Sequence, residues 1–428
     1  MLKKKHINIT SITKLLTVIV FCKILGYFTL SENISVTRVV KILLRVSTTL
    51  GAVFLFINMN KKGVPERFKV SNWWILGLYL FYFFLGGLSL FWSTKPGYSL
   101  LQLVMNSESI LFCAYFFKYV YTLNYYCKLE DQKIQLSKIF GDAIFVINLL
   151  FLIGVIAMPD LFLRLTHGGA EKRLGGYLMN PNELGMLAVI GLACYLSYWK
   201  KSSNKKGLFF QFLIVFICLL LTSSRSSMIG FLLILLYHVN QSNNVKLKAG
   251  IIISIIASLP LVINTIFLKQ GDLEEVMSMT GRLPFWKALF NEGFPKEPWL
   301  GYGYMRIAYT DAFHSVHTYA GKMTHNTFIQ VLMNLGIVGF VTVFWQLFFT
   351  TIKMFQLADK RMKSFAIGLF IPIIINSFTE FGIFGEANYG ILFYQVIIFL
   401  IVIKERKVLT SIEIRRESVF LEGYEINN

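Results

Sequence analysis

The sequence predicts an all-α integral membrane protein: one membrane domain over residues 1–428, with about twelve transmembrane helices and one long extracytoplasmic loop. First, 55% of the residues are hydrophobic and only 15% are charged, whereas soluble domains carry about 25% charged residues. Second, the apolar residues occur in runs of roughly 17–25, the length at which a helix spans a bilayer. Third, basic and non-basic connections alternate along the chain. Transmembrane strands would instead give runs of about 10 residues with alternating polarity.

The first two spans have the weakest pattern, because Lys23 and Arg45 lie within them. The spans are expected near residues 13–30, 37–58, 72–93, 98–121, 139–159, 182–199, 207–223, 225–239, 248–269, 326–352, 364–384 and 388–404.

Lysine and arginine gather in every second connection, and cytoplasmic loops are the ones that carry such an excess. An even number of spans then places both termini in the cytoplasm, including the tail 405–428. The remaining connections that carry polar motifs face outward: 160–181, the tight turn 222–226, and the long loop 270–325 between the ninth and tenth spans.

The composition argues against several other classes of protein. The net charge is +19, but the basic residues are spread over short loops rather than one face, so no nucleic acid is expected as a partner. The five cysteines show no metal-ligand spacing, so no metal site is predicted. The N-terminal lysines are not followed by a small-residue cleavage site, which indicates an uncleaved first span.

The connection 160–181 ends in a polar segment that contains Arg173, Asn180 and Asn182. Asn180 as the cap and Pro181 as the first helical residue make an ordinary helix start. The N–H groups at that start also favour an anion. A structural role at the start of the helix and a role in substrate binding therefore both account for these residues.

Arg225 lies between two apolar runs, in a turn that includes Ser224 and Ser226. An arginine at this depth is costly unless it is paired or lines a wet cavity. The alternative is an arginine that extends its head to the outer surface. The flanking serines supply further donors and favour the binding of an oxyanion.

The long loop 270–325 contains a short segment that begins at Arg282 and is predicted to form an amphipathic helix in the interface. Its apolar side chains, Phe285, Trp286 and Leu289, are expected to face lipid. Loops of this length in compact proteins are usually functional or disordered, and the composition does not indicate disorder.

Farther along the same loop, residues 298–304 form a turn with two glycines and several aromatic rings, among them Tyr302. Aromatic rings stack on sugar faces, but in membrane proteins they also anchor the chain at the interface. Both interpretations of these rings stay open.

His325 lies where the loop re-enters the membrane, next to Asn326, which is able to cap the span. Asn326, Gln330 and Asn334 follow at four-residue spacing and share one helical face. A histidine beside a cap is often only structural, but a polar stripe that leads inward favours a cavity wall. Glu380, at the outer end of span eleven, is a weaker candidate for the same cavity.

Two arginines and a histidine on one membrane face suit a reaction of a lipid-linked phosphate ester. Pyrophosphate leaves readily once its charge is neutralised, and the guanidinium fork does this well. The acceptor hydroxyl needs a base, which His325 or a carboxylate could supply, with His314 and His317 as competitors. The outer loops contain no Asp-x-Asp, so neither a metal nor another cofactor is indicated.

These motifs together resemble the O-antigen ligase and O-antigen polymerase family of polytopic membrane proteins. The resemblance covers about residues 170–345 at the level of motifs, and the whole chain at the level of span count. The motifs that carry it, in order, are Asn180-Pro181-Asn182, Thr-Ser-Ser-Arg225, Gly281-Arg282 with Trp286, Gly301-Tyr-Gly303, and His325-Asn326 with Gly336 and Gly339.

The resemblance implies a metal-independent glycosyltransferase whose donor is a glycan linked to undecaprenyl pyrophosphate. Arg225 and Arg282 would hold the donor pyrophosphate, and His325 would activate the acceptor hydroxyl. It implies a bacterial plasma-membrane location with an extracytoplasmic site, and as pathway partners a flippase and a chain-length regulator. The loop is fairly short, and Pro284 beside Arg282 departs from the pattern.

Within the family, we favour a polymerase of capsule, exopolysaccharide or O-antigen over a ligase that transfers the chain to lipid A-core. A third branch of the family glycosylates protein, and the lack of an added soluble domain in this sequence argues against it. A transporter is the rival of another class; it would use intramembrane carboxylates such as Glu108 and Asp142 as a proton relay. A structural scaffold is the third alternative, and it leaves Arg225 unexplained.

Overall fold

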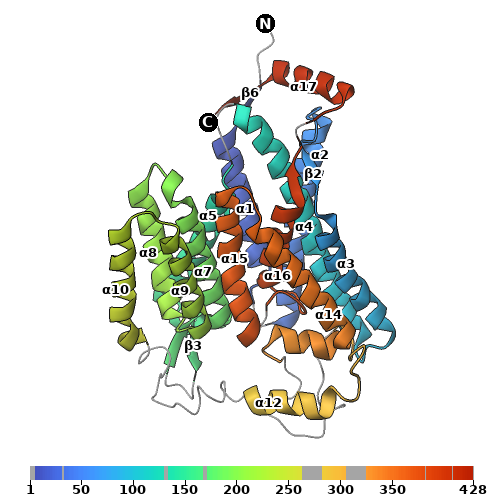
Figure 1. Cartoon of the computed structure of the whole chain (residues 1–428), viewed down its shortest axis with the longest axis vertical. Coiled ribbons are helices and arrows are strands. Elements are labelled where there is room, and N and C mark those ends of the chain that lie inside the picture. Colours follow the sequence, from blue (N-terminus) through green and yellow to red (C-terminus); the bar gives the residue numbers. More distant parts are fainter. Residues whose placement is uncertain are drawn as a thin grey trace.

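The computed structural model describes residues 5–30, 33–129, 134–166, 171–262, 282–304, 324–380, 382–406 and 408–427. These residues form a helical bundle (Figure 1). Both termini and α17 (Ser411–Gly423) lie at one end of the bundle, and α12 (Arg282–Ala288) and β3 (Leu163–Thr166) lie at the other. The two ends are called the terminal end and the α12 end below.

Twelve apolar helices build the bundle, and each overlaps one of the predicted spans. They are α1 (Ile9–Leu25), α2 (Ile34–Lys61), α3 (Trp73–Leu88), α4 (Pro96–Leu129), α5 (Leu136–Ala157), α7 (Pro181–Tyr198), α8 (Lys205–Leu221), α9 (Arg225–Asn240), α10 (Val245–Val262), α14 (Thr327–Phe355), α15 (Lys360–Thr379) and α16 (Tyr389–Val402). Short helical elements are η1 (Ser89–Phe91), α6 (Pro159–Phe162), η3 (Trp199–Lys201), α12 and η5 (Leu289–Gly293).

Six helices of the described residues are long and apolar enough to cross a membrane: α2, α3 continued by η1, α4, α5, α14 and α15. This confirms an all-α membrane protein. Helices α8 and α9 have 17 and 16 residues, fewer than the roughly 20 that a bilayer usually requires. The count of twelve crossings therefore stays a prediction.

The centre of the bundle is formed by α7 and α16. Every residue of α16 is buried, and α7 is buried along most of its length. The periphery is different: Phe54, Phe84 and Phe209 on the outer helices are 65%, 57% and 56% exposed. Large apolar side chains without protein neighbours on the outside of a helical bundle fit contact with lipid.

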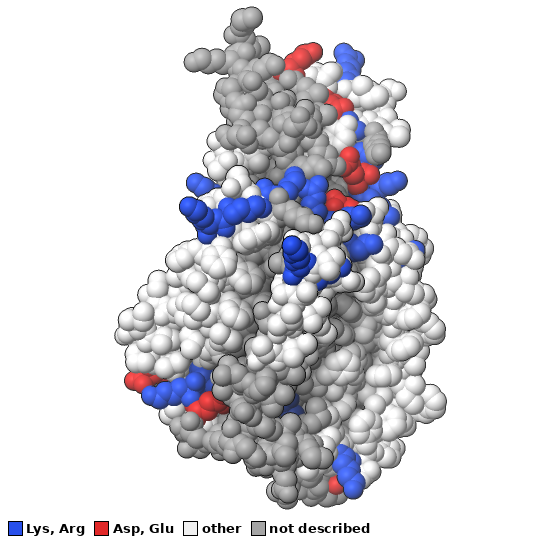
Figure 2. Space-filling view, turned by 60° about the vertical axis from the view of Figure 1, so that its left-hand side comes forward, with Lys and Arg blue, Asp and Glu red and all other residues white. Residues whose placement is uncertain are grey.

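On the face that Figure 2 shows, basic side chains form a band near the terminal end. The chain supplies this end with lysines and arginines at the end of α2 and the starts of α8, α10 and α15, namely Lys61, Lys62, Lys205, Lys206, Lys246, Lys360 and Arg361. The connections rich in lysine and arginine therefore lie at the terminal end, and the connections that alternate with them lie at the α12 end.

Among the described residues, three pairs of short strands lie outside the long helices. Strand β1 (Lys5–Asn8) pairs in parallel with β6 (Tyr424–Asn427), and β2 (Phe68–Val70) pairs antiparallel with β5 (Ile403–Glu405). At the α12 end, β3 pairs antiparallel with β4 (Glu171–Leu174), with Leu163 opposite Leu174 and Thr166 opposite Glu171. The sequence analysis did not predict this hairpin.

The loop segment 298–303 is inserted at a break in α14. Gly336 has φ +61° and ψ −160° inside the helix, and a Cβ there would lie 2.3 Å from the Trp299 carbonyl. The loop supplies the hydrogen bonds that the helix lacks at the break: the Tyr302 N–H donates to the Met333 carbonyl at 2.9 Å, and the Ile337 N–H to the Pro298 carbonyl at 2.8 Å. Glycine at position 336 is thus required by the close backbone approach.

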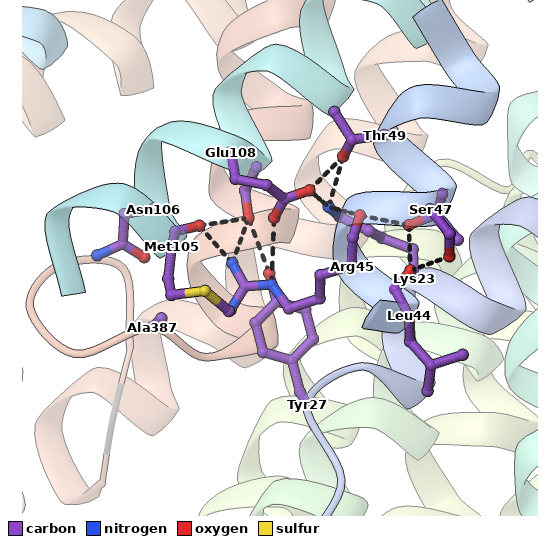
Figure 3. Close-up of polar contacts among 12 residues, drawn as sticks. Lys23, Tyr27, Leu44, Arg45, Ser47, Thr49, Met105, Asn106, Glu108 and Ala387 are labelled. Atoms are coloured by element: carbon purple, nitrogen blue, oxygen red, sulfur yellow. Dashed lines mark hydrogen bonds and ion pairs between the residues drawn. The ribbon is translucent and has the colours of Figure 1, made fainter. Parts of the chain in front are cut away.

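The two basic residues within the first two spans, Lys23 and Arg45, contact a carboxylate inside the bundle. Lys23 and Arg45 both bind the Glu108 carboxylate, with Arg45 Nε 3.2 Å from Oε2 (Figure 3). Thr49 also donates to Glu108, and Arg45 Nη2 donates to Ser109 Oγ at 2.9 Å. We call these five side chains the Glu108 cluster. It fixes α1, α2 and α4 to one another.

Candidate functional site at the α12 end

Glu380 is the centre of the polar network at the α12 end. It is 2% exposed and lies directly after α15. Its Oε1 accepts from Arg282 Nη2 at 2.8 Å and from Asn182 Nδ2 at 2.8 Å, and its Oε2 lies 2.8 Å from His325 Nδ1. Burial raises the pKa of this carboxyl, but the hydrogen bond and charge of His325, the charge of Arg282 and the amide of Asn182 lower it to about 2. Glu380 is therefore a carboxylate at neutral pH.

His325 is held in a single orientation by this carboxylate. It has a left-handed backbone, with φ +52°, directly before Asn326, whose side chain accepts from the N–H groups of Phe328 and Ile329 and so caps α14. A neutral imidazole whose Nδ1–H donates to Glu380 presents Nε2 as an acceptor. The His325 side chain is 21% exposed, which suits a group that has to reach a substrate.

Arg282 connects the loop helix α12 to the end of α15. Besides the ion pair with Glu380, its Nη1 donates to the Thr379 carbonyl. Pro284 does not interrupt α12, which is helical from Arg282 to Ala288. The departure from the family pattern at this proline is thus compatible with a helix.

The expectation that the apolar face of α12 meets lipid is wrong. Phe285 and Leu289 are 2% and 1% exposed and pack against α14 in a small core that includes Tyr302 and Met333. Trp286 Nε1 donates to the Thr324 carbonyl at 2.7 Å, next to His325. The physical reason is that α14 offers an apolar surface at this point, formed by Ile329, Leu332 and Met333.

Tyr302 supports this core rather than an open surface. It is 8% exposed, and its hydroxyl donates to the Gly293 carbonyl at 2.7 Å. The structure thus places Tyr302 and Trp286 beneath and beside the segment that carries His325.

Arg173 extends the network to the β3–β4 hairpin. Its Nε donates to the Thr222 carbonyl at 2.8 Å, and its Nη2 to Asn182 Oδ1 at 2.7 Å. Asn182 thereby joins Arg173 to Glu380. Asn180 has the structural role: its side chain caps α7 by accepting from the Asn182 N–H at 2.9 Å.

Arg225 is the first residue of α9, at the same end of the bundle. Ser224 caps the helix, and its hydroxyl lies 2.8 Å from that of Ser227 and 3.4 Å from that of Ser226. Burial lowers the pKa of the Arg173 guanidinium, Glu171 and Glu380 raise it, and the charges of Arg164 and Arg225 lower it. Arg225 is thus close enough to Arg173 for the two cations to repel each other.

The polar stripe of α14 joins the loop to the helix. Gln330 Oε1 accepts from the Thr324 N–H at 3.2 Å, and its Nε2 donates to Asn334 Oδ1 at 2.8 Å. Both side chains are buried, at 7% and 2% exposure. Gln330 therefore fixes the residue that precedes His325, and the stripe is a hydrogen-bonded support.

Glu183 is a carboxylate that the sequence analysis did not select. It follows Asn182 in the first turn of α7 and lies within electrostatic range of Glu380, Lys41 and Glu386. Among the residues that the structure describes, no hydrogen bond or ion pair of its side chain is seen. Its position beside Asn182 was the only signal in the sequence. His314 and His317 lie outside the described residues.

The carboxylates of the proposed proton relay lie elsewhere. Glu108 is bound by Lys23 and Arg45 in the Glu108 cluster. Asp142 on α5 accepts from Gln211 at 3.5 Å. Among the described residues, no hydrogen bond or ion pair joins Glu108 to Asp142.

A comparison with protein families matches residues 210–344 to the family described as O-antigen ligase. This confirms the family resemblance that the motifs predicted. No curated protein matches the chain. The matched region contains Arg225, Arg282 and His325. Glu380, which binds Arg282 and His325, and Asn182, which binds Glu380, lie on either side of it.

Proposed function

We propose, with the O-antigen ligase match as the premise, that this chain is a membrane glycosyltransferase that polymerises oligosaccharide repeat units linked to undecaprenyl pyrophosphate. The product would be a surface polysaccharide such as a capsule, an exopolysaccharide or an O-antigen. The observation that carries the proposal is the pairing of Glu380 with both His325 and Arg282. It joins a candidate base and a candidate phosphate ligand through one carboxylate.

The donor pyrophosphate is expected to bind among the arginines. Arg173, Arg225 and Arg282 bring three positive charges to the α12 end, and Glu380 compensates one of them. The remaining charge matches a pyrophosphate diester, and guanidinium groups bind phosphate oxygens in a bidentate way. The start of α9 at Arg225 adds N–H groups that point toward the same end.

His325 is the proposed general base. Glu380 orients the ring through Nδ1, so Nε2 is able to accept the proton of the acceptor hydroxyl. The hydroxyl oxygen then forms a bond to the anomeric carbon, and the bond from that carbon to the pyrophosphate oxygen breaks. The leaving group departs as undecaprenyl pyrophosphate with the electron pair, stabilised by the arginines. A single displacement of this kind inverts the anomeric configuration.

The ligase alternative uses the same donor site and differs only in the acceptor. We favour the polymerase because Asn180-Pro181-Asn182 and Thr324-His325-Asn326 are closer to that branch. We propose a bacterial plasma-membrane location with the basic terminal end in the cytoplasm and the α12 end outside, as the positive-inside rule predicts. A flippase and a chain-length regulator are the expected partners of the same pathway.

Glycan analysis of cells that express Arg225→Ala tests this proposal, with the membrane level of the variant measured. Lys287→Ala is the matched control, because Lys287 is an exposed cation on α12 at the same end. Accumulation of single lipid-linked repeat units with loss of long polymer supports the polymerase. Long lipid-linked polymer that never reaches lipid A indicates the ligase. Normal glycan at a normal protein level would refute an enzymatic role for Arg225.

A further inference from the structure

The helix α17 and the C-terminal end of α2 lie at the terminal end (Figure 1) and border a cavity of about 420 Å³. The volume lies in the range of ligand sites, about 300–1,000 Å³. The Glu380 network lies at the opposite end of the bundle, so the proposed mechanism does not use this cavity. Its described lining combines cations with apolar side chains and contains no carboxylate: Lys62, Gly63, Ile412, Arg415, Arg416, Val419 and Phe420.

Contacts with the bundle fix α17 as a wall of this cavity. Glu417 forms an ion pair with Arg67 Nη2, and the Arg67 guanidinium lies over the Tyr125 ring, 3.9 Å from its centroid. Phe420 is 5% exposed and packs its ring against that of Tyr126, with the centroids 5.4 Å apart. These contacts attach one side of α17 to the bundle, so the adjoining side keeps its position at the cavity.

The side of α17 that lines the cavity carries two cations and two apolar residues. Ile412 is followed at three, four and seven positions by Arg415, Arg416 and Val419, a spacing that places all four on one side of a helix. Ile412 and Val419 are 71% and 66% exposed. Among the described residues, the side chains of Arg415, Arg416 and Lys62 show no hydrogen bond or ion pair to a protein group. This side of α17 therefore offers positive charge beside uncovered apolar surface.

The neighbouring helix α2 has a lipid-facing side that ends next to the cavity. Helix α2 is long and apolar enough to span a membrane. Its exposed apolar residues repeat every three or four positions: Val36, Val39, Leu43, Val46, Leu50, Phe54 and Ile57. At 1.5 Å per residue they cover about 32 Å, close to the roughly 30 Å of a bilayer core. Lipid headgroups are thus expected at the level of Lys61, one turn beyond Ile57 on the same side of the helix.

The position of the cavity selects among anions. Lys62 follows Lys61 directly and lines the cavity, so the cavity lies where the lipid-facing side of α2 ends. A free phosphate would pair with the cations and leave Ile412 and Val419 uncovered, whereas a phospholipid supplies a phosphate and apolar chains together. Basic side chains at a membrane surface also attract anionic lipids. The ligand that matches both the charge and the apolar surface is therefore an anionic phospholipid.

We propose that this cavity binds one anionic phospholipid from the leaflet at the terminal end. Arg415, Arg416 and Lys62 bind the phosphate, and the guanidinium groups are suited to bidentate contacts with its oxygens. Ile412 and Val419 cover the glycerol and the first methylene groups, and the acyl chains lie along the exposed side of α2. The proposal requires that α2 spans a membrane and is independent of the proposed glycosyl transfer.

Native mass spectrometry of the full-length protein in detergent tests this site, because it counts bound lipids one at a time. Phosphatidylglycerol is the anionic probe, and phosphatidylcholine with the same acyl chains has no net charge. We expect the first phosphatidylglycerol to bind at least about tenfold more tightly than phosphatidylcholine. Arg415→Gln with Arg416→Gln should weaken phosphatidylglycerol binding by about tenfold or more, since each cation near an anionic surface contributes roughly fivefold. Lys206→Gln with Lys246→Gln removes two exposed cations elsewhere at the terminal end and should leave this binding unchanged.

Glu417→Gln distinguishes a built site from the general attraction of a basic surface. It removes the ion pair that attaches α17 to the bundle, and it also makes the protein more positive. A built site should therefore bind phosphatidylglycerol severalfold more weakly after this substitution, whereas a diffuse basic surface would bind it more tightly.

Equal binding of the two lipids would overturn the proposal, as would a preference for phosphatidylglycerol that survives Arg415→Gln with Arg416→Gln. An equal loss of binding in Lys206→Gln with Lys246→Gln, or tighter binding to Glu417→Gln, would reduce the site to a diffuse basic surface and overturn it as well. Displacement of phosphatidylglycerol by an equal concentration of hexaglutamate would assign the cavity to an acidic protein segment instead, against the proposal.

Discussion

Two carboxylates, the partly buried Glu108 and the buried Glu380, each bind two basic side chains, yet their surroundings differ. Lys23 and Arg45 around Glu108 are 0% and 2% exposed, and their donors end on protein oxygens between three long helices. Around Glu380, the Arg282 and His325 side chains are 16% and 21% exposed and come from the ends of helices. The first cluster holds helices together, whereas the second presents charged groups outward. A carboxylate that binds two basic side chains is thus insufficient to identify a site; the exposure of its partners is needed as well.

The largest effect is expected at His325. Asparagine tolerates the left-handed backbone of this position but is no base, so His325→Asn should reduce transfer by roughly 10²–10⁴-fold. The measurement is polymer formation from lipid-linked repeat units by the purified protein. The thermal unfolding temperature of the variant is the control, and it should stay close to that of the parent. A reduction below about tenfold would remove the general-base role.

The next effect is expected at Glu108, on stability rather than on chemistry. Glu108→Gln leaves Lys23 and Arg45 as buried cations without their carboxylate, which costs about 3–5 kcal/mol. The unfolding temperature in detergent should fall, and a second substitution, Lys23→Met, should restore part of the loss by removing one cation. An unchanged unfolding temperature for Glu108→Gln would contradict the structural role of the Glu108 cluster.

A smaller effect is expected from pH. The pKa of Glu380 is lowered to about 2 in the folded protein, below the ordinary value of about 4.3. Its stabilising contribution, on the order of 3 kcal/mol, is therefore present above about pH 4.3 and is lost as the pH falls toward 2. The difference in unfolding free energy between the parent and Glu380→Gln should shrink as the pH falls from about 4 toward 2. A difference that stays unchanged over this acid range would contradict this assignment.

The smallest effect is expected at Trp286. Trp286→Phe keeps an aromatic ring but removes the hydrogen bond to the Thr324 carbonyl, which contributes about 1 kcal/mol. Because Thr324 precedes His325, transfer should fall by about fivefold with little change in expression. Steady-state kinetics would show this change, and Phe290→Leu, at an exposed position beyond α12, is the matched control.

The apolar pattern of the sequence predicts much of the fold but little of the polar network around Glu380. The apolar runs predict where the twelve apolar helices of the described residues lie, although α1, α2 and α4 contain Lys23, Arg45 and Glu108. The inward-facing apolar side of α12 was missed, since a short amphipathic pattern does not say whether lipid or protein covers it. Asn180 was predicted as a cap or an anion ligand, Ser226 as a further donor and Gln330 as part of a polar helical face. Asn180 does cap α7, Ser226 contacts Ser224, and Gln330 supports Thr324.

Glu380 as the centre of the network could not be predicted with comparable strength. Its partners, Asn182, Arg282 and His325, are separated from it by 198, 98 and 55 positions. Only tertiary packing brings these segments to one point. The signal in the sequence was a carboxylate, Glu380, at the end of an apolar run. The sequence analysis treated it as a weaker candidate for the cavity than His325.

The segment 298–303 is hydrogen-bonded to α14 at its break, and these bonds limit how the segment is able to move. Swinging the segment 298–303 outward would break the backbone hydrogen bonds that it shares with Met333, Asn334 and Ile337, and each buried group left unpaired costs about 1–3 kcal/mol. This part of the loop is therefore a stationary rim and not a hinged cover. Under the proposed function, the shape of this rim, rather than an opening motion of these residues, would limit how bulky a branch the glycan can carry.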